Sequence, residues 1–225
     1  MLNVICVLKS GGDYGPGDVY CLAEGVRQHL AAPYRLICLT DMGELIDPRP
    51  MAGEESLEIL PLAHNLPGWW SKLEIFTIEG AVLYLDLDTV IVGSLDDLAE
   101  AVRHLEGRFM MLRKWKGVGW GSGIMGWQGD WSGVLRSFLA QRKRFERRPR
   151  GWDMRINEGT NAVVYRGDQD WLSIHLENLS AEIKAAQDLC PGIYSYKRQI
   201  QGNGMPVDAR VIVFHGRPRP AEVQL

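Results

Sequence analysis

The segment AVLYL at residues 81–85 constrains the fold most, because it is apolar at every position and runs directly into an Asp-Leu-Asp sequence. A strand with one solvated face alternates apolar and polar side chains, whereas an unbroken apolar strand is typical of a sheet covered on both faces. The chain has 225 residues, 46% of them hydrophobic, which is enough for one well-buried domain. We therefore predict a single α/β domain with residues 81–85 as its central strand.

Apolar runs and helical patterns alternate before this strand. Residues 2–8 form an apolar run that ends in a Gly-rich loop. From residue 18 to residue 30, apolar side chains recur at helical spacing, with Asp18 placed as the N-cap. Two more apolar runs follow at residues 36–39 and 57–60. This alternation favours a Rossmann-like architecture, with a mostly parallel central sheet flanked by helices.

The elements around and after the central strand are less regular. Short helices are expected at residues 69–76 and 95–105, the second with Ser94 as its N-cap. The Gly-rich stretch at residues 117–129 suits close approach of the backbone to a ligand more than regular structure. Helical spacing resumes from residue 131 to residue 145, and a last apolar strand ends before His215.

Charge is unevenly distributed along the chain. The net charge of −3 gives no sign of a nucleic-acid partner. The run at residues 142–150, however, holds six basic residues and one acidic residue, so it carries +5 on its own. The run fits the solvated end of a helix. It equally fits attraction to an anionic membrane, or to a phosphorylated glycolipid, through Arg142, Arg147 and Arg148.

The expected location is the cytoplasm. If the basic run binds an anionic membrane, the protein is also expected in peripheral contact with the inner membrane. The N-terminus has no basic leader followed by a cleavage site, and no apolar run reaches the roughly 20 residues that a membrane span needs. The sequence does not indicate an oligomeric state.

Asp86 and Asp88 are the first candidates for chemistry. In an extended segment, residues i and i+2 point to the same side, so the two carboxylates are expected to converge. Such a pair suits a divalent cation that is shared with substrate phosphates. The alternative is that the pair simply ends a strand in solvent.

His215 stands at the exit of the last strand. If that strand neighbours the central one, its imidazole completes an Asp, Asp, His ligand set, which suits Mn²⁺ better than Mg²⁺. Arg217 and Arg219 follow in a Pro-containing tail, where a guanidinium could hold a diphosphate through paired hydrogen bonds.

The stretch LYLDLDTVIVGSLDDL resembles the metal-binding segment of the GT-A glycosyltransferases related to glycogenin and to the bacterial lipopolysaccharide galactosyltransferases. Further segments occur in the order typical of that family: Asp13 and Tyr14 after the first strand, WWSKLEIF before the central strand, then GSGIM, GDQDWL and FHGRPRP. The resemblance covers nearly the whole chain. It implies a GT-A fold, with a nucleotide-binding half at residues 1–105 and an acceptor half at residues 106–225.

The resemblance also implies roles for individual residues. It makes Asp86, Asp88 and His215 the Mn²⁺ ligands, places Tyr14 against the uracil ring, and gives the sites beside the sugar's anomeric carbon to Asp168 and Gln169. The remaining residues expected at the donor are Asp13, Lys72, Ser122, Gly216 and Arg217. The implied reaction moves a hexose from a UDP-sugar, with UDP-glucose and UDP-galactose first, to a saccharide or glycolipid with retention of configuration. A front-face route is expected, since no side chain stands out as a strong base for the acceptor.

Two departures from the family pattern bear on the donor site. The usual Asn-Ser-Gly is replaced by Gly121, Ser122 and Gly123, which removes one polar side chain near the donor sugar. The terminal His-to-Lys motif is compressed, so that either Arg217 or Arg219 takes the place of the family's lysine.

Two other classes of function remain open. DLDTV also resembles the opening motif of haloacid-dehalogenase-type phosphatases, in which Asp86 would be the nucleophile, although three candidate strands precede it here. A catalytically silent nucleotide-sugar-binding module is the third possibility. Among the eight tryptophans, Trp120 and Trp127 are the best candidates for stacking on an acceptor sugar.

Overall fold

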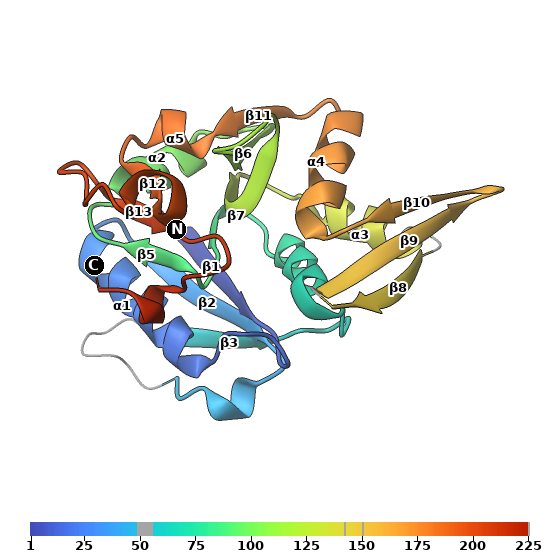
Figure 1. The fold of residues 1–225 in the computed structure, drawn as a ribbon, viewed down its shortest axis with the longest axis horizontal. Helices are drawn as coiled ribbons and strands as arrows, with labels where there is room; N and C mark the ends of the chain where they lie inside the picture. The colour runs from blue at the N-terminus through green and yellow to red at the C-terminus, as the bar shows by residue number, and fades with distance from the viewer. Residues whose placement is uncertain (49–55, 142, 150, 225) are drawn as a thin grey trace.

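The predicted central strand is confirmed. The computed structural model describes residues 1–48, 56–141, 143–149 and 151–224. Strand β4 (Ala81–Leu85) is buried at all five positions. It lies inside a seven-stranded sheet of order β11-β6-β7-β4-β1-β2-β3, with helices on both faces (Figure 1). The chain is therefore an α/β protein in which both faces of β4 are covered, as its unbroken apolar sequence requires.

The sheet is mixed because one strand, β7, runs against the other six. Strands β1 (Leu2–Leu8), β2 (Tyr34–Thr40), β3 (Leu57–Pro61) and β4 are parallel neighbours. On the other side, β7 runs antiparallel to both β4 and β6, and β11 is parallel to β6. The bounds of these last strands are β6 (Arg108–Arg113), β7 (Trp120–Trp127) and β11 (Glu182–Ala185). Four of the six strand pairs are parallel and both antiparallel pairs involve β7, so the expectation of a mostly parallel sheet is confirmed.

Strand β7 corrects the expectation that the Gly-rich stretch is irregular. It pairs on both sides, and a Cβ atom at Gly126 would lie 2.7 Å from both Met110 Cε and Val102 Cγ2. The close approach that requires glycine here is therefore between the sheet and the helix that covers it. Trp127, at the end of β7, is fully buried and stacks on Phe109 at 5.6 Å between ring centroids.

One face of the sheet is covered by α1 (Pro16–His29), α2 (Asp96–Arg103) and the short α5 (Ala186–Leu189). The start of α1 differs from the expectation, because Gly15 is its N-cap. Asp18 instead lies in the first turn, where its carboxylate accepts a hydrogen bond from the Gly15 N–H at 2.8 Å. Ser94 is likewise not the N-cap of α2, which is Leu95, although the Ser94 hydroxyl accepts a hydrogen bond from the Asp96 N–H at 3.1 Å.

The opposite face is covered by η2 (Gly68–Thr77), a 3₁₀ helix, together with α3 (Ser132–Ala140) and α4 (Asp168–Asn178). Aromatic side chains fill this second core layer. Trp70 from η2 stacks on Phe138 from α3 at 5.4 Å between centroids, and Phe138 meets Trp171 of α4 edge-on at 5.1 Å. The three remaining short helices are η1 (Gly43–Leu45), η3 (Tyr196–Ile200) and η4 (Pro220–Glu222). No helix in the described ranges is long and apolar enough to cross a membrane.

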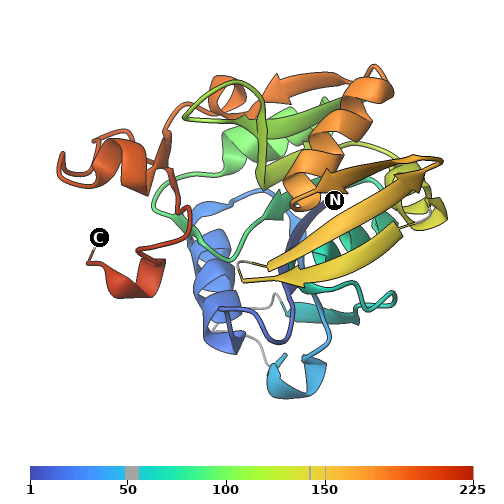
Figure 2. The ribbon, with the colours of Figure 1, turned by 45° about the vertical axis from the view of Figure 1, so that its right-hand side comes forward.

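The helix predicted from residue 131 to residue 145 is wrong in its second part. Helix α3 ends at Ala140, and the basic run continues as β8 (Lys143–Arg148). This strand pairs with β9 (Gly151–Glu158), which pairs with β10 (Asn161–Tyr165), and the three form a ribbon beside η2 and α3 (Figures 1 and 2). Period-2 alternation decides the outcome, because Phe145 points inward onto Trp70 and Phe138. The basic run is therefore an edge strand, and its residues 142 and 150 lie outside the described part of the chain.

A small second sheet holds the end of the chain. Strand β5 (Thr89–Ile91) follows the Asp-Leu-Asp sequence and pairs antiparallel with β13 (Val211–Val213), which pairs with β12 (Ile193–Ser195). The last strand is therefore outside the main sheet, contrary to the condition under which His215 was expected at the metal site. It reaches the same region by another route, since the Phe214 N–H donates to the Asp88 carbonyl at 3.1 Å.

Candidate functional site

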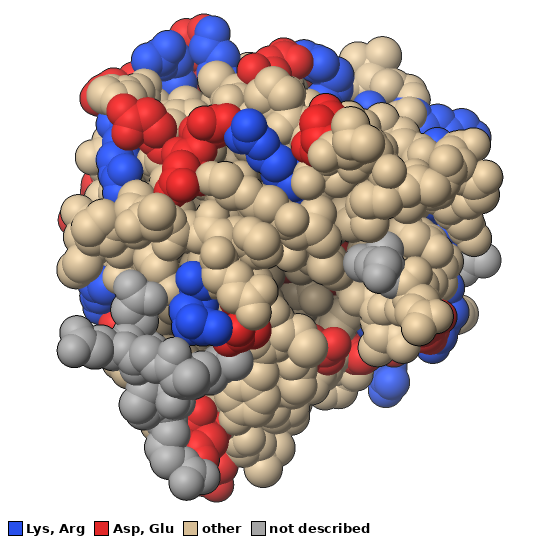
Figure 3. All heavy atoms as spheres, turned by 90° about the vertical axis from the view of Figure 1, so that its left-hand side faces the viewer, with Lys and Arg blue, Asp and Glu red and all other residues tan. Residues whose placement is uncertain are grey.

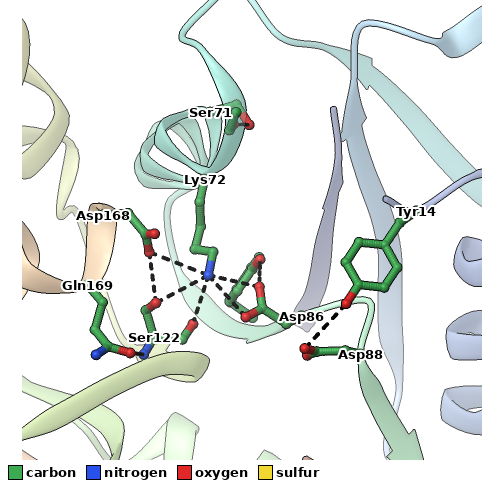
Figure 4. Close-up of polar contacts among 10 residues, drawn as sticks. Tyr14, Ser71, Lys72, Asp86, Asp88, Ser122, Asp168 and Gln169 are labelled. Atoms are coloured by element: carbon green, nitrogen blue, oxygen red, sulfur yellow. Dashed lines mark hydrogen bonds and ion pairs between the residues drawn. The ribbon is translucent and has the colours of Figure 1, made fainter. Parts of the chain in front are cut away.

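The site lies where β4 ends, in the turn that leads to β5. Asp86 and Asp88 stand in this turn, which is closed by a hydrogen bond from the Thr89 N–H to the Asp86 carbonyl at 3.0 Å. The two side chains therefore do not share one side of a strand. Asp86 faces Lys72, while Asp88 faces Tyr14 (Figure 4). Both nevertheless line one cavity of about 410 Å³.

The walls of this cavity come from five segments that are far apart in the sequence. They are the β4–β5 turn, the end of β6 with the loop after it, the start of β7, the start of α4, and η3 together with the end of β13. The predicted site residues that line it are Asp86, Asp88, Ser122, Gln169 and His215. The fold thus gathers candidates from both halves of the chain around one space.

Lys72 lies behind the cavity and joins three of the predicted residues. Its ammonium is 2.9 Å from Asp86 Oδ1, 3.4 Å from Asp168 Oδ2 and 3.2 Å from Ser122 Oγ. Burial by itself lowers the pKa of Lys72, but the carboxylates of Asp168 and Asp86 outweigh it and raise that pKa above its ordinary value. Lys72 is therefore a buried cation that fixes the position of both carboxylates.

Ser122 connects the start of β7 to the start of α4. Its hydroxyl donates to Asp168 Oδ2 at 2.7 Å, and its N–H donates to Gln169 Oε1 at 3.4 Å. The adjacent Gly123 lies beside the acidic turn, where a Cβ atom would be in ordinary van der Waals contact with Asp86 Oδ2 at 3.4 Å. Lys72, Asp86, Ser122, Asp168 and Gln169 form one connected set.

Tyr84 belongs to this set and was missed from the sequence, where it is one apolar-looking position of β4. Its hydroxyl donates to Asp86 Oδ1, and the ring is buried in the core. Burial, followed by the charge of Asp86, raises the pKa of Tyr84 well above its ordinary value, so the phenol keeps its proton. Asp86 is thus held from both sides, by a hydroxyl and by an ammonium.

Asp88 has a more unusual environment. Burial and the neighbouring charge of Asp86 raise its pKa to about 7, although Lys72 and the Tyr14 hydroxyl act in the opposite direction. The Tyr14 hydroxyl lies 3.4 Å from Asp88 Oδ2. A carboxylate that is destabilised by burial and by a second carboxylate gains most from a nearby divalent cation.

His215 completes the polar lining on the side of β13. Its ring lies 4.9 Å from the Trp115 ring, and its carbonyl accepts a hydrogen bond from Lys197 Nζ at 3.0 Å. Burial, followed by the charges of Lys197 and Arg198, lowers the pKa of His215, so that the ring is neutral at neutral pH. Neutral imidazole is the form that binds metal ions.

The side chains around the cavity are of the kinds that bind metal ions, but they do not form a ligand cluster. Among the described residues, no three His, Cys, Asp or Glu side chains lie close enough together to hold a metal ion. Asp86, Asp88 and His215 line the same cavity. The charge of Asp86 partly offsets the lowering of the His215 pKa by burial and by Lys197 and Arg198. Two carboxylates and a neutral imidazole on one cavity fit Mn²⁺ in chemistry, and the side chains would have to converge around the ion.

The C-terminal tail separates the two candidate arginines. Arg217 is exposed and forms an ion pair with Glu222. The Arg219 side chain is only 16% exposed, pairs with Asp13, and places its guanidinium 4.5 Å from the centre of the Tyr14 ring. Its Nε and Nη1 atoms are buried without a hydrogen-bond partner. Arg219, and not Arg217, is therefore the tail arginine beside the site. Gly216, with φ +73°, provides the left-handed backbone between His215 and these arginines.

Of the two candidate acceptor-binding tryptophans, Trp127 is ruled out by its burial in the aromatic core. Trp120 is half-buried at the start of β7. The cavity contains a different tryptophan, Trp115, together with basic residues that the sequence did not single out. The available signal was the Lys-Trp-Lys sequence just before the Gly-rich stretch, where two cations flank an aromatic ring.

Comparison with known proteins does not assign the chain to a family. No protein-family model matches it. No curated protein matches its sequence either. The functional proposal therefore depends on the cavity, on the residues around it and on the motifs described from the sequence.

Proposed function

We propose that the protein is a metal-dependent glycosyltransferase that moves a hexose from a UDP-sugar to a saccharide or glycolipid acceptor. One observation carries the proposal: Asp86, Asp88 and His215 line one cavity. Lys72 contacts Asp86, Asp168 and Ser122, and Ser122 in turn contacts Gln169. These are the residues that the family resemblance selects from distant parts of the sequence. The α/β sheet with its functional turn beyond the carboxyl end of a central strand supports this proposal and the finer assignment to the GT-A type.

The proposed cation-binding residues are Asp86, Asp88 and His215, with Mn²⁺ preferred and Mg²⁺ as the alternative. When bound, the cation supplies Lewis-acid stabilisation of the negative charge on the leaving diphosphate. The protein contributes the geometry. Lys72 and Tyr84 hold Asp86 in place, and Tyr14 holds Asp88.

At the nucleotide, Tyr14 provides a ring for the uracil and Arg219 provides the guanidinium for the diphosphate. The two unpartnered nitrogens of Arg219 support this role, because a buried donor without an acceptor is costly until a ligand supplies one. Asp13 orients Arg219 through their ion pair. Arg217 is 70% exposed and has no buried nitrogen without a partner, which argues against the role that the resemblance gave it.

At the sugar, Asp168 and Gln169 provide the polar groups near the anomeric carbon. Asp168 is an unfavourable nucleophile, because Oδ2 already accepts a hydrogen bond from Ser122 and is paired with Lys72. Both partners stabilise its negative charge and lower its reactivity. This supports a front-face reaction with retention, in which the departing phosphate takes the proton of the acceptor hydroxyl.

The direct test is a screen of UDP-sugars for hydrolysis in the presence of Mn²⁺. We expect turnover of one UDP-hexose that requires the metal and that falls by at least about 100-fold in Asp88→Asn, because that variant loses a proposed ligand. Glu182→Gln on β11 is the control and keeps wild-type activity, since Glu182 is exposed and distant from the cavity. If the wild-type protein binds UDP but turns over no UDP-sugar, a catalytically silent binding module is favoured. A phosphorylated Asp86 trapped with a generic phosphate ester, without UDP-sugar turnover, would identify a phosphatase.

A further inference from the structure

The cavity has acidic residues at its base and basic residues around its opening. The acidic floor consists of Asp86 and Asp88, with Asp168 and Lys72 behind them. The rim consists of Lys114 and Lys116, from the loop after β6, and Lys197 and Arg198, from η3. None of these four side chains forms an ion pair with a described residue. A fifth cation of the lining, Arg113, is different, because both of its terminal nitrogens are engaged by Asp188. The rim thus carries four uncompensated positive charges around one opening.

On the face shown in Figure 3, acidic and basic side chains are interspersed. Four like charges without counter-ions repel one another and destabilise the fold, unless an anion binds between them. The rim therefore points to an anionic ligand.

His215 links the two segments of the rim to the proposed metal site. The Trp115 ring, between Lys114 and Lys116, packs on the imidazole, and Lys197 donates to the His215 carbonyl. An anion held by the rim would therefore lie beside the reacting centre.

The charge of the donor accounts for only part of the rim. With Lys72 included, the ionised forms of Asp86, Asp88 and Asp168 carry two net negative charges, which one divalent cation balances. The diphosphate of a UDP-sugar adds one negative charge on each phosphate. The four positive charges of the rim then exceed the two negative charges of the diphosphate by two. A phosphate monoester, with about −2 at neutral pH, supplies that difference.

We propose that the basic rim binds a phosphate monoester on the acceptor saccharide, so that the acceptor is a phosphorylated sugar. This inference rests on the proposed glycosyltransferase function. Lysine and arginine side chains from two segments converge on the phosphate, and the acceptor hydroxyl is thereby presented next to His215. Two of the four rim charges balance the diphosphate of the donor, and the remaining two select the acceptor.

The test uses methyl phosphate as a minimal phosphate monoester and methyl sulfate as its monoanionic counterpart of similar shape. The protein is first saturated with UDP and Mg²⁺ and then titrated with each probe by NMR. We expect methyl phosphate to bind the UDP-loaded protein, and methyl sulfate to bind more weakly. Lys116→Ser/Arg198→Ser should weaken methyl phosphate binding by about tenfold or more, because two charge-assisted contacts are lost. UDP affinity should fall by a smaller factor, since Arg219 and a cation held by Asp86 and Asp88 also bind the nucleotide.

The control is Arg144→Ser/Arg147→Ser on β8, which removes the same charge from exposed positions outside the cavity and should leave both affinities unchanged. Displacement of methyl phosphate by UDP would overturn the inference, because the rim would then belong to the donor. Methyl phosphate binding that survives Lys116→Ser/Arg198→Ser, or no binding to the wild type, would also overturn it. Failure of the proposed function is detected separately, as no turnover of any UDP-sugar, while titration of the free protein with methyl phosphate would still show whether the rim holds an anion.

Discussion

Lys72 offers the sharpest test of how the site is held together. Its ammonium lies between the carboxylates of Asp86 and Asp168, and the side chains of Lys72 and Asp168 are only 10% and 8% exposed. Lys72→Met keeps the length of the side chain and removes the charge. The buried carboxylate of Asp168 and the partly exposed one of Asp86 then face each other without a cation, and removal of one partner from a buried ion pair costs roughly 3–5 kcal/mol.

The structure places Lys72→Met at the lower end of that range. The Asp86 side chain is 27% exposed toward the cavity, so water compensates part of its charge. We therefore expect a loss of about 3 kcal/mol in the free energy of unfolding at pH 7. For a protein of this size, that loss lowers the melting temperature by roughly 6–12 °C. Urea unfolding followed by circular dichroism measures it.

Two comparisons isolate the cause. Lys184→Met removes a lysine from an exposed pair with Glu182, where the side chains are 39% and 60% exposed, and should cost less than about 1 kcal/mol. Adding Asp168→Asn to Lys72→Met removes one of the stranded charges, so the double variant should be more stable than the sum of the single changes. A cost for Lys72→Met no larger than that of Lys184→Met would refute the buried-cation argument.

Three other measurements probe separate parts of the molecule. Gly126→Ala should destabilise the fold by about 1–3 kcal/mol in urea unfolding, because its Cβ would lie 2.7 Å from Met110 and Val102, and Gly17→Ala in open space is the control that should not. Burial lowers the pKa of Lys143 to about 8, so the folded protein binds fewer protons than the unfolded chain from about pH 8 up to 10.5. Wild type should therefore gain stability relative to Lys143→Met over that window, and a difference that stays constant with pH would contradict the shift. Peripheral membrane contact through β8 requires that Arg144→Ser/Arg147→Ser weaken binding to anionic vesicles, and unchanged binding would remove that hypothesis.

The fold could be predicted from the sequence where a pattern of side chains fits only one kind of structure. The unbroken apolar sequence of β4 admits only a strand covered on both faces, and the structure has it so. The Gly-rich stretch was misjudged because its glycines indicated an open loop, whereas Gly126 serves the packing of β7 under α2. The basic run was misjudged because its first residues continue a helical pattern. Only the tertiary contact of Phe145 with Trp70 and Phe138 selects the strand.

The candidate site was predictable in its residue types and not in its geometry. Asp86 and Asp88 could be selected from the sequence, but the turn that directs them to different partners depends on hydrogen bonds between distant segments. Tyr84 could not be selected, since a tyrosine inside an apolar strand carries no local sign that its hydroxyl reaches a carboxylate. The choice between Arg217 and Arg219 required the path of the tail past Asp13 and Tyr14.

The separation of charge in the cavity connects the two proposals. Some cations are neutralised by a direct acidic partner, as Arg113 is by Asp188 and Arg35 by Glu58. Around His215 the protein keeps Asp88 and the basic rim apart, although pairing them would relieve both the raised pKa of Asp88 and the repulsion within the rim. A ligand that carries a cation to the floor and anions to the rim removes both costs at once. A metal-bound sugar nucleotide beside a phosphorylated acceptor has that distribution of charge, whereas a neutral ligand would leave both ends of the cavity uncompensated.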